Sequence, residues 1–130
     1  MTSRTVTTVL PAPREEVFRY LSDIEKLPEW ATEFARELKR EDGRYKVVNN
    51  SGEYFFEIDA HPDTGVIDMY AGPEPELMAL FPTRVVEVAG GGTAYTFTMF
   101  QAPDMPDELF ASRHASLQRE FRNIEAVFSA

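Results

Sequence analysis

The sequence predicts an α+β fold in which a curved antiparallel sheet of about seven strands wraps around a long C-terminal helix. Two short helices are expected between strands 1 and 2. Three observations predict this fold: a Thr- and Val-rich run near the N terminus, strand-like runs separated by turn signals, and a late apolar stripe of helical period. A sheet must bury one face against another element, and only the C-terminal segment is long enough to cover it.

The first predicted elements are a strand and a short amphipathic helix. Residues 4–10 are rich in Thr and Val and are expected to form a strand, which the prolines of residues 11–13 stop. From Arg14 onward apolar residues recur at spacings of three and four, which predicts a helix. We expect Pro28 to end or kink this helix and residues 29–31 to form a second short helical turn.

Six strand-like runs follow, and turn residues separate them. Asp42-Gly43 and Gly52, for example, supply the positive φ that tight hairpins require. Most neighbouring strands should therefore pair antiparallel, as a meander. The predicted strands cover residues 34–41, 45–48, 53–60, 66–71, 76–88 and 93–101.

The last predicted element is a helix of about 23 residues, or ~35 Å. Asp104 is expected to cap it, with Met105 and Pro106 in its early positions. Asp107 and Glu108 then lie in the first turn, where the helix dipole favours negative charge. One apolar stripe runs along this helix and consists of Leu109, Phe110, Leu117, Phe121, Ile124 and Phe128.

Length and composition limit the class of protein. At 130 residues the chain has the size of one domain, and it has no cysteine for thiol catalysis, thiolate metal sites or disulfides. A net charge of −9 argues against nucleic acid and against an anionic membrane surface as partners. No run approaches the ~20 apolar residues of a membrane helix, so we expect no integral membrane segment. Without an apolar signal core near Met1, a cytoplasmic protein is expected.

Strand alternation predicts which side chains face the helix. Tyr54, Phe56 and Ile58 share one strand face, and Tyr95 and Phe97 share another. Such side chains can simply fill a core. Together they also permit a pocket, because a curved sheet and a single helix cannot close on each other along their whole length. The predicted ligand-binding residues are Tyr54, Phe56, Ile58, Met69, Met78, Arg84, Tyr95, Phe97, Met99, Phe110, His114, Leu117 and Phe121.

Two of these residues are polar enough to anchor a ligand. His114 falls within or beside the apolar stripe, where it could hydrogen-bond a ligand carbonyl or act as general acid or base. It is the candidate catalytic residue, although it could equally be a core-edge histidine with a structural partner. Arg84 shares a strand face with Met78 and could hold an anionic head group. Arg113, beside the stripe, is expected to point outward.

Two further patterns are interpreted as structural. Glu57, Asp59 and His61 share the other face of their strand and could be drawn as a metal site. A strand's outer face next to a turn offers solvent rather than converging ligands, so no metal is expected. The glycines of residues 90–92 lie between strands rather than at a helix start, which indicates a hairpin and not a phosphate cradle. No cofactor is expected.

A motif in the first quarter of the chain has a familiar form: a strand ending in an apolar residue, Ala-Pro, an acidic pair, Val-Phe, Leu-x-Asp and then Pro-x-Trp. Its residues are Leu10, Ala12, Pro13, Glu15, Glu16, Val17, Phe18, Leu21, Asp23, Pro28 and Trp30. The motif resembles the opening of the START-like superfamily, also called SRPBCC. The most similar subgroup is the polyketide cyclase/dehydrase and lipid-transport-type proteins.

The resemblance implies a helix-grip fold, in which the two short helices close one end of a sheet that wraps the long helix. It also implies a deep hydrophobic cavity, and residues 1–130 would form a single START-like ligand-binding domain. Members of the superfamily bind lipids, sterols, polyketides, aromatics or plant hormones, and a minority are enzymes.

Three functions stay open at this point. The first is a carrier or sensor that binds a lipid, polyketide, quinone or aromatic molecule. The second is a polyketide cyclase or dehydratase that uses a cavity His or Tyr, since cyclisation requires mainly shape and proximity. The third is a protein-interaction or assembly module. Phe55, an apolar residue among polar neighbours, favours a possible homodimer.

Overall fold

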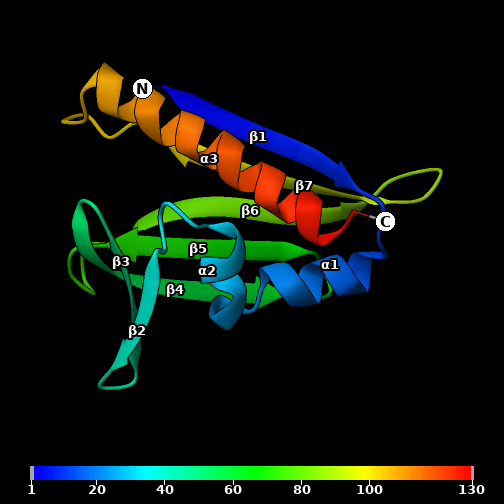
Figure 1. The fold of residues 1–130 in the computed structure, drawn as a ribbon, viewed down its shortest axis with the longest axis horizontal. Coiled ribbons are helices and arrows are strands. Elements are labelled where there is room, and N and C mark those ends of the chain that lie inside the picture. The colour runs from blue at the N-terminus through cyan, green and yellow to red at the C-terminus, as the bar shows by residue number, and fades with distance from the viewer. Residues whose placement is uncertain (1, 130) are drawn as a thin grey trace.

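The computed structural model describes residues 2–129 and contains a seven-stranded sheet (Figure 1). All neighbouring strands are antiparallel, in the order β1-β7-β6-β5-β4-β3-β2. The predicted meander is confirmed, and β1 joins it by pairing with the last strand. The strands are β1 (Ser3–Leu10), β2 (Glu37–Glu41), β3 (Arg44–Asn49), β4 (Gly52–His61), β5 (Val66–Gly72), β6 (Ala79–Glu87) and β7 (Thr93–Phe100).

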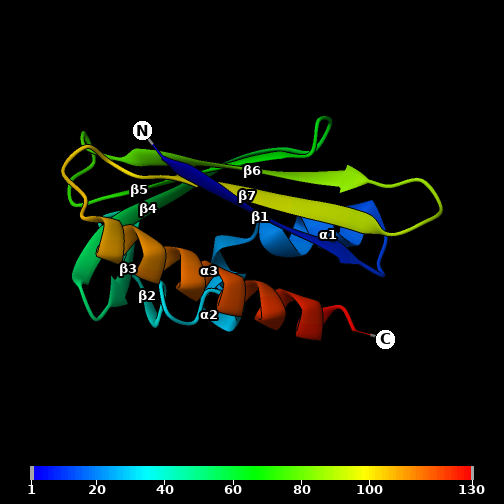
Figure 2. The ribbon, with the colours of Figure 1, turned by 90° about the horizontal axis from the view of Figure 1, so that it is seen from above.

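Helices cover one side of this sheet. The short helices α1 (Arg14–Leu21), η1 (Ile24–Lys26, a 3₁₀ turn) and α2 (Leu27–Trp30) connect β1 to β2, and α3 (Asp107–Val127) follows β7. Figure 2 shows the sheet as one layer with α3 beneath it, while the β2–β3 end curls toward the start of α3. This is the predicted α+β helix-grip fold. Within residues 2–129, no helix is long and apolar enough to cross a membrane.

The core is tightest where α1, α2 and the second half of α3 meet the sheet. Val17 and Leu21 of α1, Trp30 of α2 and Ile124 of α3 are each at most 2% exposed. Apolar positions three and four apart give α1 one buried side, and the turn at Pro11 directs that side onto the sheet. One end of the fold is therefore closed by packed side chains.

The clearest differences from the predicted boundaries lie at the helix ends. Asp104 does not cap α3, because Pro106, with an extended φ of −61° and ψ of 147°, precedes the first helical turn. Pro28 lies in the first turn of α2, where its missing N–H leaves no helical hydrogen bond unmade, and it does not end a helix. Residues 34–36, predicted as the start of a strand, belong to a loop of residues 31–36, since β2 begins only at Glu37.

Candidate ligand-binding site between the sheet and α3

The inner face of the sheet is apolar from β3 to β7. Strand register arranges it in rows, so that Phe97 pairs with Thr83, and Thr83 in turn with Ile67. Most residues predicted to bind a ligand lie on this face or on the side of α3 that covers it: Tyr54, Phe56, Ile58, Met69, Tyr95, Phe97, Met99, Phe110, Leu117 and Phe121.

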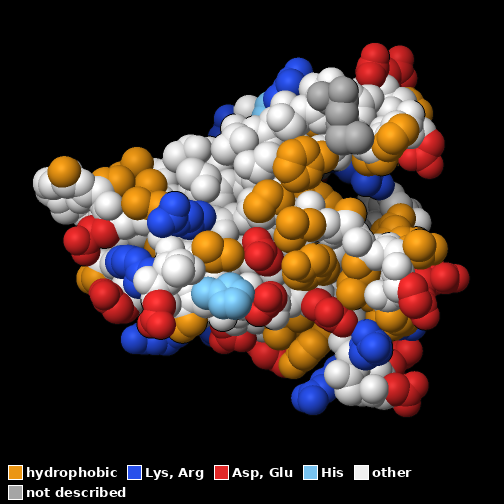
Figure 3. Space-filling model, turned by 180° about the vertical axis from the view of Figure 1, so that it is seen from behind, with side chains coloured by type: hydrophobic (Ala, Val, Ile, Leu, Met, Phe, Trp, Pro, Cys, Tyr) orange, Lys and Arg blue, Asp and Glu red, His pale blue; other side chains and the backbone are white. Residues whose placement is uncertain are grey.

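Burial divides this interior into a closed half and an open half. Near the end of α3, Leu10, Val85 and Ile124 are at most 1% exposed. Near the start of α3 several apolar side chains are only partly buried, although Phe110 is 4% exposed. Figure 3 shows a hollow there, bordered by apolar side chains. The partly buried set is Phe34, Tyr54, Ala71, Phe81, Phe97 and Met105.

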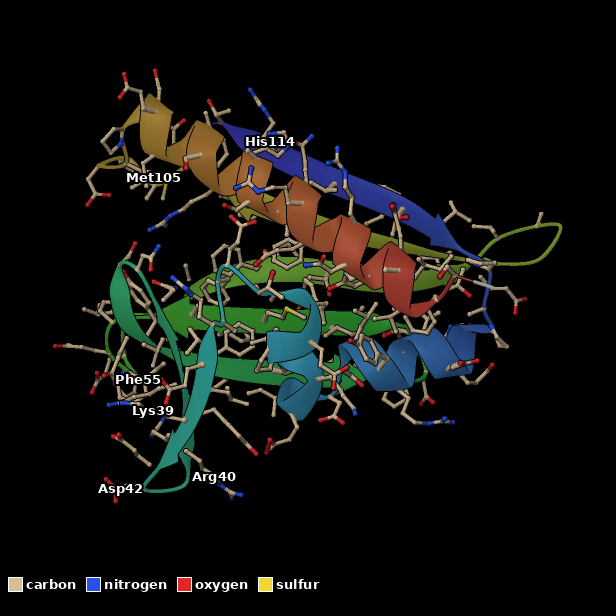
Figure 4. All side chains as sticks on the ribbon, in the orientation of Figure 1. Lys39, Arg40, Asp42, Phe55, Met105 and His114 are labelled. Carbon is tan, nitrogen blue, oxygen red and sulfur yellow. The ribbon has the colours of Figure 1, made fainter. Side chains whose placement is uncertain are left out.

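The two lips of the open half come from different parts of the chain. Met105 lies beside the first turn of α3 (Figure 4), and the Gln101 side chain fixes this segment by donating to the Met105 carbonyl at 2.9 Å and to Asp107 at 2.8 Å. Phe34, from the loop before β2, packs its ring edge against Phe56 at 5.6 Å. Both lips thus present an apolar side chain to the space between the sheet and α3.

Tyr95 marks the boundary between the two halves. Its side chain is 0% exposed, and its ring stacks on Phe121 of α3 with 5.4 Å between centroids and 20° between planes. Phe121 also contacts Phe97 edge-on at 6.4 Å. Among the described residues, the Tyr95 hydroxyl has no hydrogen-bond partner. Buried hydroxyl groups normally have one, so the site holds an unused donor among aromatic rings.

Thr83 is the polar neighbour of this donor. The Thr83 hydroxyl donates its proton to the Ile67 carbonyl at 2.7 Å. It is near enough to Tyr95 to lower the pKa of that phenol slightly, but no hydrogen bond of ordinary geometry joins the two groups. Burial has the larger and opposite effect and raises the pKa of Tyr95. The phenol is therefore neutral and takes part only in hydrogen bonds, as a donor or an acceptor. The Tyr95 hydroxyl lies near Thr83, and Thr83 pairs with Phe97, a residue of the partly buried set. The Tyr95 hydroxyl therefore lies toward the open half.

Glu120 is a buried polar residue that sequence reasoning missed. It is 4% exposed, and one carboxyl oxygen accepts the backbone N–H groups of Glu33 at 3.0 Å and Phe34 at 2.9 Å. Burial raises the pKa of Glu120 to about 7, although the two N–H groups oppose the shift. Its position, three residues after Leu117 and directly before Phe121, is the one signal that it borders the apolar stripe.

Other side chains of α3 near Glu120 also form hydrogen bonds to the segment before β2. Arg119 donates twice to the Glu33 carboxylate, at 2.7 and 2.8 Å, and lowers the pKa of that carboxyl. Asn123 donates to the Trp30 carbonyl at 3.0 Å. These bonds, with those to Glu120, fix the loop on α3 and thereby fix Phe34 at the lip of the open half.

A second hollow lies on the side of β3 and β4. It is a hollow of about 400 Å³ lined in part by Ile24, Tyr45, Phe56 and Ile58, two of which belong to the predicted ligand set. The Tyr45 hydroxyl donates to Glu25 at 2.9 Å and so fixes one wall. A larger depression of about 580 Å³ lies between residues 11–14 and 87–92, at the closed end, and none of the predicted ligand residues lines it.

Three predicted site residues lie elsewhere. Arg84 points to the outer face of β6, where its Nε donates to the Thr64 carbonyl at 3.3 Å, because the inward positions of that strand are Thr83 and Val85. Met78 precedes β6 and is half-buried. His114 is half-buried on the side of α3 next to β1 (Figure 4), away from the open half.

The outward residues of β4 do not converge. His61 lies 3.2 Å from Asp59, with 51% and 61% of the two side chains exposed, while Glu57 pairs with Arg44 at 3.0 Å. Phe55, also on this face, has its ring 4.8 Å from the Lys46 ammonium. These contacts describe a solvated charged surface rather than a ligand cluster.

The model of the Activator of Hsp90 ATPase homolog 1-like protein family matches residues 11–129. The chain belongs to this family. The family is a member of the START-like superfamily, so the resemblance drawn from the N-terminal motif is confirmed. No curated protein matches the sequence.

Solved structures of the same fold have low sequence identity. XoxI from Bacillus cereus superposes with a TM-score of 0.76 at 13% identity, over 98% of this chain and 96% of that protein. The Aha1 dimer from Colwellia psychrerythraea gives 0.74 at 15% identity, over 98% and 96%. BexL, a di-domain ARO/CYC protein from the BE-7585A biosynthetic pathway, gives 0.70 at 13% identity, over 97% of this chain and 46% of BexL. At these identities the likeness establishes the fold alone.

Proposed function

We propose that the protein is a carrier or sensor that binds an apolar small molecule with a hydrogen-bond acceptor, in the open half between the sheet and α3. The observation that carries this proposal is the buried, unpartnered hydroxyl of Tyr95. Leaving a buried polar group unpaired costs about 1–3 kcal/mol, and a ligand carbonyl that accepts from Tyr95 would remove this cost. The aromatic rings of Phe97 and Phe121 would flank the body of the ligand.

The chemistry of the walls narrows the ligand class. A pure hydrocarbon would bury apolar surface but would leave the Tyr95 donor unpaired. A quinone, an aromatic ketone or a polyketide supplies both a flat apolar body and an acceptor oxygen, which favours these over a fatty acid chain.

Binding is favoured over catalysis by the protonation state of the site. A cyclase or dehydratase needs a group that can take up a proton, whereas burial keeps the Tyr95 phenol protonated. His114, the candidate acid or base, lies next to β1 and not at the open half (Figure 4). Neither Tyr95 nor His114 therefore provides a proton acceptor at the open half.

The test is a comparison of Tyr95→Phe with the wild type, by thermal shift and by native mass spectrometry with menadione, emodin and palmitic acid. The ligand-free variant should be more stable, because its unpaired hydroxyl is gone. Its affinity for menadione or emodin should fall about fivefold to tenfold, the value of one neutral hydrogen bond. Stability and affinity should thus change in opposite directions.

Tyr20→Phe is the matched control, because Tyr20 lies on α1, outside the predicted ligand set, and its hydroxyl donates to the Glu29 carboxylate at 3.1 Å. Its ligand affinity should equal that of the wild type. The proposal is wrong if none of the three compounds raises the melting temperature of the wild type, or if Tyr95→Phe binds them all as tightly.

A further inference from the structure

The outer face of β1, β7, β6 and β5 is poor in charge. Its outward positions are every second residue of 3–9, 94–100, 80–86 and 66–70, fifteen in all. Only Arg84 and Asp68 of these are charged, although 27% of the whole chain is. Figure 3 looks onto this side and shows a broad uncharged area with charged side chains toward its borders. We call it the threonine face, after the four threonines that β1 and β7 contribute to it.

The threonine face is continuous across its strands. Thr7 pairs with Thr96, and Thr96 with Arg84, while Val9 pairs with Ala94 in the next row. The hydroxyls of Thr5 and Thr98 share a hydrogen bond of 2.8 Å. Val9 is 60% exposed. Because these side chains are short and paired in register, they form an even surface that a second even surface could cover.

We propose that the threonine face joins two copies of this chain in a two-fold dimer. Each copy carries a net charge of −9, so two copies repel wherever carboxylates face each other. The neighbouring outward positions of β4 hold Glu53, Glu57 and Asp59, and a basic partner would bind there rather than at a face with one carboxylate. The uncharged threonine face instead suits a second copy of this acidic chain, because the two copies can meet there without bringing many carboxylates together.

The two charges of the face agree with a self-complementary contact. In a two-fold interface the same patch faces itself, so residue i contacts j and j contacts i. Arg84 of β6 pairs with Val66 of β5, and Asp68 lies two residues after Val66 on the same strand. A two-fold axis between these positions brings the Arg84 of each copy to the Asp68 of the other, while Asp59, the β4 neighbour of Asp68, lies at the border of the contact.

The size of the face predicts a weak dimer. The face is four strands wide, at about 4.8 Å per strand, and about eight residues long, at ~3.3 Å per residue. It therefore measures roughly 19 by 26 Å, or ~500 Å² for each copy. The total of ~1,000 Å² is at the lower limit of specific interfaces. We expect a dissociation constant in the micromolar range rather than a permanent dimer.

Sedimentation velocity of the full chain from 5 to 500 µM tests the proposal. The wild type should change from monomer to dimer in this range, and Thr96→Glu, which adds a carboxylate to the threonine face of each copy, should weaken association at least tenfold. Ser51→Glu adds the same charge in the exposed turn between β3 and β4 and should leave association unchanged. Circular dichroism melts verify folding, and Val86→Glu, at a 36% exposed position of the face, replaces Thr96→Glu if that variant unfolds.

Salt provides an independent readout. Raising NaCl from 50 to 500 mM screens the repulsion between two bodies of charge −9, so dimerisation should become tighter. A wild type that stays monomeric at 500 µM overturns the proposal. So does a folded Thr96→Glu that associates like the wild type, or association that weakens as salt rises. None of these outcomes bears on ligand binding at Tyr95, which faces the opposite side of β7.

Discussion

The carboxyl of Glu120 lies almost out of reach of water and accepts hydrogen bonds from two backbone N–H groups. Its folded-state pKa of about 7 is above the value of about 4.3 expected in an unfolded chain. The folded protein therefore binds this proton more tightly than the unfolded chain does. The stability that the proton provides is complete below about pH 4.3 and is lost as the pH rises through 7.

Glu120→Gln should remove this pH dependence, because the amide keeps an acceptor oxygen and carries no charge. The variant should match the wild type near pH 4 and exceed its free energy of unfolding above pH 7, by up to about 4 kcal/mol. Urea denaturation between pH 4 and 8 measures the difference. Glu33→Gln is the control with the opposite sign, since Arg119 lowers the pKa of Glu33 and ionisation there stabilises the fold. A Glu120→Gln difference that is the same at every pH would contradict the prediction.

Among the elements, the turn between β4 and β5 depends on a glycine for two separate reasons. Gly65 has φ of +80°, and a Cβ built there overlaps the Val85 carbonyl oxygen. The Val85 N–H in turn donates to the Gly65 carbonyl at 2.9 Å, so the turn and β6 are in direct backbone contact. Gly43, in the β2–β3 turn, has nearly the same φ of +77° but nothing within 4 Å of its Cβ position.

Gly65→Ala and Gly43→Ala therefore separate conformational strain from steric overlap. Both place alanine in the left-handed region, at a cost of about 1–2 kcal/mol. Gly65→Ala should cost at least about 2 kcal/mol more, because the backbone of β6 must move. Midpoints of urea unfolding compare the two variants. Equal midpoints would show that the turn accommodates the extra methyl group without displacing β6.

Local chemistry also explains which elements sequence reasoning could predict. The Asp42-Gly43 pair has φ values of +52° and +77°, as its hairpin prediction requires, and the other strands follow from similar turn signals. Residues 34–36 of the loop before β2 were predicted as part of a strand, because the local sequence does not contain the reason for the shape of the loop. That reason is Glu120, Arg119 and Asn123 on α3, about ninety residues later in the chain.

Across the whole molecule, the inner and outer faces of the sheet limit what alternation can predict. In β4 the outward positions hold carboxylates, so Tyr54, Phe56 and Ile58 could be assigned to the interior. In β6 both faces carry apolar side chains, and period-two alternation cannot tell them apart. Arg84 was for this reason assigned to the ligand site together with its apolar neighbours. The ambiguity arises because the outward positions of β6, which belong to the threonine face, are mostly apolar.

The pairing of β1 with β7, from Ser3 with Phe100 to Leu10 with Thr93, has a consequence for synthesis of the chain. The hairpins from β2 to β6 can close as they leave the ribosome, since each joins neighbours in sequence. β1 is made first but has no partner until β7 emerges, and the inner face stays uncovered until α3 follows. For most of translation the nascent chain thus carries an unpaired strand and an open apolar sheet, the features that chaperones bind and that cause aggregation.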